Sequence, residues 1–202
     1  MLEEIVKGRM GMYCFLSSVL LNIPSRDFLE DLMKGKVGFP EIGEIKEGVE
    51  IIREFAANFS DVEEIERAIR QEYTAVFIGP FSDYVSPYQS TYEGENPYGP
   101  VTLRIKEKYK KFGYKYDYNE PADHIGVELA FMAESCREFL NGNKDELIKQ
   151  NEMLNEIEGW VFKFCEKIEK HPEAKFYRGI AKILKNFIRF DKNILKELIA
   201  LI

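Results

Sequence analysis

Four polar residues near the middle of the chain, Glu120, Asp123, His124 and Glu128, are the best suited to acid–base or metal chemistry. A carboxylate beside an imidazole is the minimum for general base catalysis. His124 and Glu128 are four residues apart, so on a helix they would share one face. A small metal-dependent hydrolase could use Glu120, Asp123 and His124. However, the sequence contains no nucleophile elbow, phosphate-binding loop, dinucleotide motif or HExxH motif to accompany them.

The same residues also have a purely structural interpretation. Asp123 would be the N-cap of a helix, with its carboxylate accepting amide hydrogens of the first turn, after the extended dipeptide Glu120–Pro121. His124 would then hydrogen-bond to the adjacent loop. One histidine among three carboxylates is a weak catalytic signal, because such groupings arise often by chance. We therefore expect a protein that is not an enzyme and that holds no catalytic or metal site.

Tyrosines are concentrated in the segment that precedes these residues. Nine of the 11 tyrosines fall between positions 73 and 118, whereas core packing alone would favour Leu and Ile. Tyrosine buries a large apolar ring and keeps a polar hydroxyl, which suits a partly wet groove for a flexible chain. The nine are Tyr73, Tyr84, Tyr88, Tyr92, Tyr98, Tyr109, Tyr114, Tyr116 and Tyr118.

The segment from Gly79 to Gly99 has no helical or strand periodicity and is punctuated by proline and glycine. A loop of this length inside a compact domain is usually functional or disordered, and its tyrosines argue for an ordered loop. It carries Asp83, Glu93 and Glu95 and no Lys or Arg. An aromatic surface rimmed by acid would select a ligand that is both apolar and basic.

Outside this loop and a second irregular stretch at 113–122, apolar residues recur at helical spacing, and no strand-like alternation bounded by hairpin turns occurs. The sequence therefore predicts an all-α fold of about eight helices. It predicts a single domain over residues 1–202, with a weak internal boundary near 141–143. Two helices are expected from their start signals, one after an N-cap at Ser25 and one after a capping box at 60–63. The other helices are expected at about 2–22, 42–59, 100–112, 123–140, 147–168, 173–190 and 191–201.

Composition excludes several classes of protein. The chain has 202 residues, is 45% hydrophobic and carries a net charge of -7, so it should not attract nucleic acid or anionic lipid. Three dispersed cysteines and two histidines build neither a disulfide framework nor a zinc site. The apolar stretch at 10–23 is too short to span a bilayer and lacks a cleavage site, so we interpret it as a core helix. We expect a cytoplasmic protein without a membrane span.

Several motifs follow one another in a fixed order between positions 73 and 132. They are Tyr73-x-x-x-Phe77 with Gly79-Pro80, Pro87-Tyr88-Gln89-Ser90-x-Tyr92, the helix end at Tyr109–Gly113, and Glu120-Pro121-Ala122-Asp123-His124 running into Glu128-Leu129-Ala130-Phe131-Met132. In order and spacing they resemble the TorD/DmsD/NarJ family of redox enzyme maturation chaperones. One departure is Gln89, where the family more often has glutamate before the serine.

The resemblance implies an all-helical, cytoplasmic, non-catalytic chaperone dedicated to a molybdenum-containing oxidoreductase. Such chaperones bind the twin-arginine leader peptide of their client enzyme, or its apo form, and delay export until the cofactor is inserted. Tyr73 and Phe77 also fit a core role, because they continue an apolar helical stripe. The peptide-binding residues expected on this basis are Tyr73, Phe77, Asp83, Tyr84, Pro87, Tyr88, Ser90, Tyr92, Glu120, Asp123, His124 and Glu128.

We expect no resident cofactor, and only the resemblance suggests weak binding of a guanine nucleotide. It likewise allows a monomer or a domain-swapped dimer. The expected partner is the catalytic subunit of a client molybdoenzyme or its basic, apolar leader. A helical adaptor without a peptide groove remains an alternative, but it would leave the tyrosines of the loop without a role.

Overall fold

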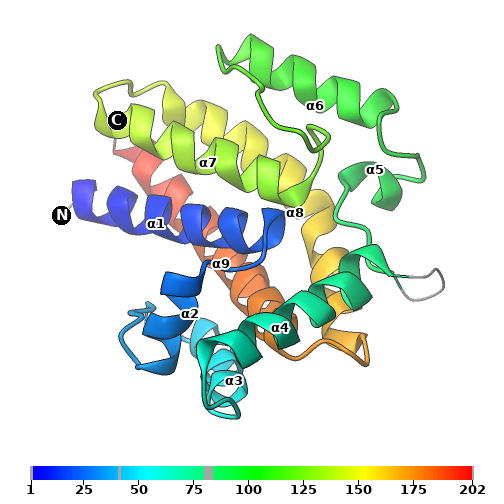
Figure 1. The fold of residues 1–202 in the computed structure, drawn as a ribbon. Coiled ribbons are helices and arrows are strands. Elements are labelled where there is room, and N and C mark those ends of the chain that lie inside the picture. Colours follow the sequence, from blue (N-terminus) through cyan, green and yellow to red (C-terminus); the bar gives the residue numbers. More distant parts are fainter. Residues whose placement is uncertain (1, 41, 80–83, 202) are drawn as a thin grey trace. The chain divides into compact units, whose positions relative to one another are not determined.

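The computed structural model describes residues 2–40, 42–79 and 84–201, and within them the chain is helical (Figure 1). No strand occurs in these ranges, which confirms the predicted all-α fold. The elements are α1 (Leu2–Leu21), α2 (Arg26–Met33), α3 (Ile45–Ala56), α4 (Val62–Tyr73), the π-helical turn η1 (Thr74–Ile78), α5 (Gln89–Tyr92), α6 (Pro100–Lys111), α7 (Ile125–Leu140), α8 (Glu146–Lys170) and α9 (Phe176–Ala200).

The chain divides into two compact units. Unit 1 comprises Met1–Leu21, Pro87–Val161 and Ile188–Ile202, and unit 2 comprises Asn22–Ser86 and Phe162–Phe187. Helices α8 and α9 therefore each contribute residues to both units. The boundary expected near 141–143 lies inside unit 1, and the expectation of a single domain over 1–202 stays a prediction.

In unit 1, α1 packs along α7 (Figure 1). Gly126 in the first turn of α7 makes this approach possible, since a Cβ there would lie 2.5 Å from Cγ of Leu21. The Ser17 hydroxyl donates a hydrogen bond of 2.7 Å to the Gly126 carbonyl. A glycine in the sequence thus fixes how closely α1 and α7 can meet.

A buried ion pair joins α1 to the second half of α9. The Arg9 guanidinium donates from Nε to Asp191 Oδ1 at 2.5 Å and from Nη2 to Oδ2 at 2.9 Å, and from Nη1 to Gln150 Oε1 on α8 at 2.7 Å. The Tyr13 hydroxyl donates to Asp191 Oδ2 at 2.6 Å. Arg9 is 2% exposed and Asp191 is fully buried, so this cluster is part of the core of unit 1.

In unit 2, α3 crosses the first half of α9 at two glycines. A Cβ on Gly48 would lie 2.6 Å from the Gly179 carbonyl oxygen, so a side chain would force the helices apart. Glu72 of α4 accepts the backbone N–H groups of Lys175, Phe176 and Tyr177 at 2.7 to 3.0 Å. A side chain distant in sequence therefore satisfies amide groups that α9 cannot pair internally.

Local signals predicted most helix ends to within a few residues. Ser25 is the N-cap of α2 and accepts from the Phe28 amide, as expected. The N-cap of α4 is Asp61 rather than Ser60, because the helix begins at Val62 and the extended Asp61 accepts from the amides of Glu63 and Glu64.

The two helices expected at 173–190 and 191–201 form one continuous helix, α9, which corrects that prediction. The reason is that Asp191 does not cap a new helix but turns its carboxylate to Arg9. No helix among the described residues has an apolar stretch long enough to cross a bilayer.

Candidate functional site

Asp123 joins two neighbouring helices of unit 1 instead of capping its own. Its Oδ2 accepts from the Ser90 amide at 3.0 Å and its Oδ1 accepts from the Thr102 hydroxyl at 2.7 Å. Its carbonyl accepts from the Gln89 amide at 2.9 Å. Asp123 is fully buried, so it ties the start of α5 to α6. The expectation that Asp123 is the N-cap of the following helix is therefore wrong.

The N-cap of α7 is His124. Its Nδ1 accepts from the Gly126 amide at 3.0 Å, and its ring lies edge-on to Tyr88 with centroids 5.2 Å apart. His124 also pairs through its backbone with Tyr88 in an isolated bridge. Burial lowers the pKa of His124 to about 4 and outweighs the nearby carboxylates of Glu120 and Asp123. The ring is consequently neutral at physiological pH.

Glu128 lies one turn further along α7 and is fully buried. Its Oε2 accepts from Trp160 Nε1 on α8 at 3.3 Å. Burial raises the pKa of Glu128 well above its usual range, and the charge of Asp123 adds to this effect. Glu128 is therefore a neutral, internal hydrogen-bonding group.

These contacts argue against a metal-dependent hydrolase site formed by Glu120, Asp123 and His124. The Nδ1 lone pair of His124 is taken by a backbone amide, so a neutral ring carries its proton on Nε2 and offers no lone pair to a metal. Both carboxylate oxygens of Asp123 already accept hydrogen bonds. Within the described ranges, no group of three His, Cys, Asp or Glu side chains is arranged to hold a metal ion.

The predicted peptide-binding residues are divided between the two units. Tyr73, Phe77 and Tyr84 belong to unit 2, Asp83 lies outside the described residues, and the other predicted residues belong to unit 1. Phe77 is 7% exposed and packs edge-on to Tyr177, with centroids 5.0 Å apart. Phe77 is thus a core residue, one of the two roles that the sequence allowed.

The predicted peptide-binding residues of unit 1 fall into a buried and an accessible group. Buried are Pro87, Ser90, Asp123, His124 and Glu128. Tyr88, Tyr92 and Glu120 are partly exposed.

The accessible group is held by contacts to its neighbours. The Tyr88 hydroxyl donates to Glu120 Oε2 at 2.9 Å, and the Tyr92 ring lies 5.2 Å from that of Trp160. Only this group can meet a ligand without a rearrangement of the core.

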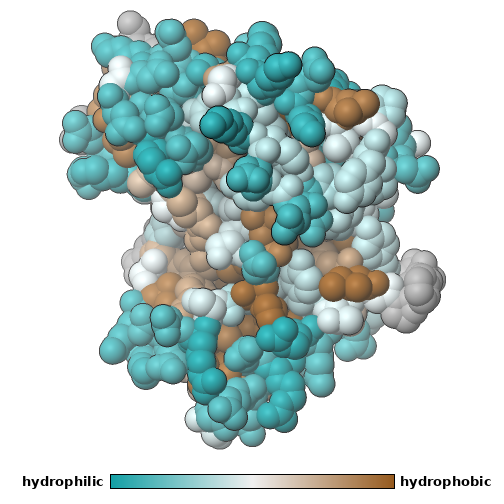
Figure 2. All heavy atoms as spheres, turned by 45° about the horizontal axis from the view of Figure 1, so that its top comes forward, coloured by the Kyte–Doolittle hydropathy of each residue, from teal (hydrophilic) through white to brown (hydrophobic). Residues whose placement is uncertain are grey.

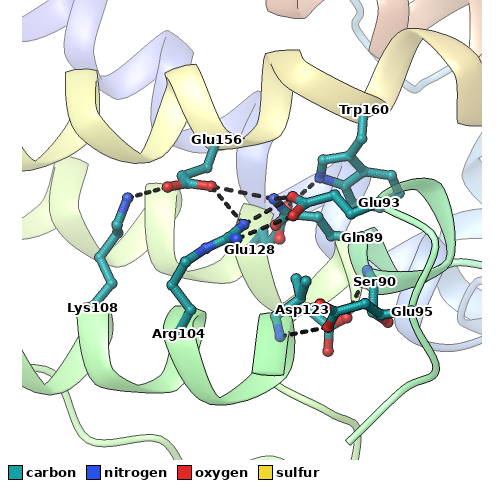
Figure 3. A network of polar contacts seen from close by, with 11 residues as sticks. Gln89, Ser90, Glu93, Glu95, Arg104, Lys108, Asp123, Glu128, Glu156 and Trp160 are labelled. Atoms are coloured by element: carbon teal, nitrogen blue, oxygen red, sulfur yellow. Dashed lines mark hydrogen bonds and ion pairs between the residues drawn. The ribbon is translucent and has the colours of Figure 1, made fainter. Parts of the chain in front are cut away.

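A polar network next to Tyr92 was missed from the sequence (Figure 3). Gln89 and Glu93 of the α5 region meet Glu156 of α8 there, together with Arg104 and Lys108 of α6. Hydrogen bonding from Arg104 lowers the pKa of Glu93. Burial opposes ionisation of Glu156, but hydrogen bonds from Lys108 and Gln89 outweigh it and lower its pKa. Both carboxylates are therefore charged.

Glu93 had a sequence signal, as an acid of the tyrosine-rich loop, whereas Glu156 had none. It is one of several glutamates on the polar side of a long helix, 67 residues from Gln89.

Four of the nine clustered tyrosines, Tyr109, Tyr114, Tyr116 and Tyr118, line a different feature of unit 1. It is a cavity of about 880 Å³ between α1, α7 and the segment at 112–118. Its remaining lining includes acidic and basic side chains alike, among them Glu134 and Arg137. This mixed lining selects no particular ligand charge.

Apolar side chains also remain exposed on α6 and just before it. Hydrophilic residues cover most of the face shown in Figure 2, with hydrophobic ones visible between them. In unit 1, Tyr98 is 74% exposed and Leu103 is 60% exposed. Leu103 directly precedes Arg104 on α6, so the two side chains point to different sides of this helix.

Comparisons with known proteins agree with the motifs. The family model described as nitrate reductase delta subunit matches residues 43–166. The chain is 26% identical to the chaperone protein TorD of Vibrio parahaemolyticus, over 91% of this chain and 92% of the relative. It is 24% identical to TorD of Photobacterium profundum, again over 91% and 92%.

The fold is similar to a crystal structure from Archaeoglobus fulgidus that is assigned to redox enzyme maturation. The TM-score is 0.52 at 26% identity, covering 88% of this chain and 93% of that one. These relatives are chaperones or maturation proteins, which confirms the expectation of a non-catalytic protein.

Proposed function

This chain belongs to the nitrate reductase delta subunit family, and we propose that it is a maturation chaperone for a molybdenum-containing oxidoreductase. In this proposal it binds the twin-arginine leader of its client, or the apo form, in the cytoplasm until the cofactor is inserted. The TorD relatives and the maturation protein of A. fulgidus support the chaperone class. The surface of unit 1 supports a basic and apolar ligand.

The observation that carries the leader-binding part is the accessible surface around α5. Tyr88 and Tyr92 are partly exposed and lie among carboxylates, with the Tyr88 hydroxyl 2.9 Å from Glu120 Oε2. Tyr98, just before α6, and Leu103, on α6, are further exposed apolar side chains of unit 1. The apolar stretch of a leader would pack on these side chains, and its arginines would meet the carboxylates. The net charge of -7 would speed the encounter.

Calorimetry with twin-arginine leader peptides tests this function. We expect binding that weakens as salt is added, because exposed charges are screened. The variant Tyr92→Ala should weaken binding by about tenfold, since aromatic residues dominate such contacts. Tyr118→Ala is the matched control, because Tyr118 is 45% exposed and lines the separate cavity.

Failure to bind every leader encoded near the gene would contradict the leader-binding part. Co-purification with the apoenzyme would then decide whether the mature client is the target. Light scattering would distinguish the monomer from a domain-swapped dimer, and titration with guanine nucleotides would test that further implication of the resemblance.

A further inference from the structure

Two accessible carboxylates of unit 1, those of Glu93 and Glu156, converge on one side chain (Figure 3). Gln89 Nε2 donates to Glu93 Oε1 at 2.6 Å and to Glu156 Oε2 at 3.2 Å. Hydrogen bonding from Arg104 lowers the pKa of Glu93 and outweighs the charge of Glu156, which opposes ionisation of Glu93 because like charges are held close together. The pair therefore requires a cation.

The cation is supplied by α6. Arg104 donates from Nη1 to Glu93 Oε2 at 3.0 Å and from Nη2 to Glu93 Oε1 at 2.8 Å, which is the bidentate geometry of a guanidinium on a carboxylate. Its Nη2 also lies 3.3 Å from Glu156 Oε2. Lys108, one turn along α6, donates to the other oxygen of Glu156.

The Arg104 guanidinium is accessible enough to solvent to exchange its contacts with Glu93 and Glu156. The side chain of Arg104 is 46% exposed, and those of Glu93 and Glu156 are 36% and 22% exposed. Ion pairs that solvent reaches contribute little net stability, because water replaces the lost contacts. Another guanidinium could take the same position without breaking the core.

Beneath the pair, the structure leaves polar atoms without partners. Gln89 is 2% exposed, and its Oε1 has no hydrogen-bond partner among the described residues, although its Nε2 contacts both carboxylates. Ser90 Oγ and Glu128 Oε1 are likewise buried and unpaired there. A buried acceptor without a donor is unfavourable, so Gln89 Oε1 is an acceptor that an N–H group of a ligand would satisfy.

We propose that Glu93, Glu156 and Gln89 form a guanidinium subsite, and that Arg104 is its internal occupant, displaced by an arginine of the incoming peptide. This proposal rests on the proposed function. It adds the site at which an arginine of the peptide binds and the side chain, Arg104, with which that arginine competes. Arginine is favoured over lysine because its planar fork matches the bidentate contact. A peptide must therefore carry a correctly placed arginine to open the site.

Calorimetry with three leader-like peptides tests the competition. They share one apolar segment and carry Arg-Arg, Lys-Lys or Gln-Gln before it. Arg104→Gln should bind the Arg-Arg peptide about three to ten times more tightly than the wild type, because the competing contact is gone. Glu156→Gln should bind it about ten times more weakly.

Arg67→Gln is the matched control for charge, since Arg67 is an exposed arginine of α4 in unit 2. It should leave the affinity unchanged. The gain in Arg104→Gln should be absent for the Gln-Gln peptide. Equal behaviour of Arg104→Gln and Arg67→Gln, or weaker binding by Arg104→Gln, would overturn the proposal.

A second measurement needs no leader. Trp160 is the single tryptophan of the chain, and its Nε1 donates to Glu128 beside the pair. Titration with diarginine amide should change its fluorescence, at lower concentrations in Arg104→Gln and not in Glu156→Gln. Dilysine amide should act more weakly.

The two measurements separate the two proposals. If the wild type binds leaders but Arg104→Gln has no effect in either experiment, the subsite is wrong and leader binding stands. If no leader binds but diarginine follows the expected order, leader binding is wrong and the subsite stands. Failure of both overturns both.

Discussion

Two arginine–carboxylate pairs in unit 1 have the same chemistry and opposite surroundings. Arg9 and Asp191 are bidentate and 2% and 0% exposed, whereas Arg104 and Glu93 are bidentate and 46% and 36% exposed. Burial opposes the charge on Arg9, but Asp191 outweighs it and raises the pKa of the guanidinium. An arginine–carboxylate pair therefore becomes structural or exchangeable according to its access to water.

The two pairs differ in whether water can solvate the charge that remains when the pair is broken. When one member of a buried pair is removed, the other charge stays in a region where water cannot solvate it. When a half-exposed pair opens, water or another cation replaces the lost partner. The first pair therefore holds α1, α8 and α9 together, and the second leaves its carboxylates available to a ligand.

The largest expected effect comes from breaking the buried pair. Arg9→Met should lower the free energy of unfolding by about 3 to 5 kcal/mol, because Asp191 is left buried without its cation. Urea unfolding measures this change. The double variant Arg9→Met/Asp191→Leu should recover much of the loss, since no unpaired charge remains. A cost for Arg9→Met no greater than for Arg104→Met would remove the distinction between the pairs.

A second prediction concerns His124, a buried group that must stay neutral. Its pKa is lowered from 6.5 to about 4 by burial. Between these values the unfolded chain binds a proton that the folded chain does not, so stability falls as the pH falls through this window. The loss should reach up to about 3 kcal/mol.

The control for this prediction is His124→Asn, which keeps an N-cap acceptor but does not titrate. Unfolding by urea at pH 7 and at pH 4.5 should show a smaller loss for the variant. Glu128, whose raised pKa has the opposite effect on stability, is present in both proteins and cancels in the comparison. An equal loss of stability in both proteins would contradict the lowered pKa of His124.

The smallest expected effect belongs to the accessible pair. Arg104→Gln should lower the free energy of unfolding by less than about 1 kcal/mol, and added salt should remove most of that difference. Thermal unfolding at low and high salt measures it. A large, salt-independent loss would show that the network of Figure 3 is part of the core and cannot exchange its arginine.

The helical fold was predictable because its signals are local. The apolar stripe of α8, from Leu147 to Ile168, and that of α7, from Ile125 to Phe139, are buried as their spacing required. The errors at Asp61, His124 and Asp191 share one cause. Which of several nearby polar residues caps a helix, or whether any does, depends on contacts that periodicity does not contain.

The candidate site was predictable only in part. The sequence indicated Asp123, His124 and Glu128 as candidate ligand-binding residues. In the structure they are buried, and they accept hydrogen bonds from α5, from the first turn of α7 and from Trp160, respectively. The carboxylate that completes the accessible network is Glu156, which is ordinary in the sequence and becomes distinctive only beside Gln89.

The helical class, the tyrosine-rich and acidic segment, and the resemblance to the chaperone family follow from the sequence alone, because these depend on local spacing and on the order of motifs. Which carboxylates solvent can reach depends on how the chain folds. Exposure and pairing are set by residues far apart in the chain, such as Glu93, Arg104 and Glu156, and water access then determines whether a charge holds the fold or can meet a ligand.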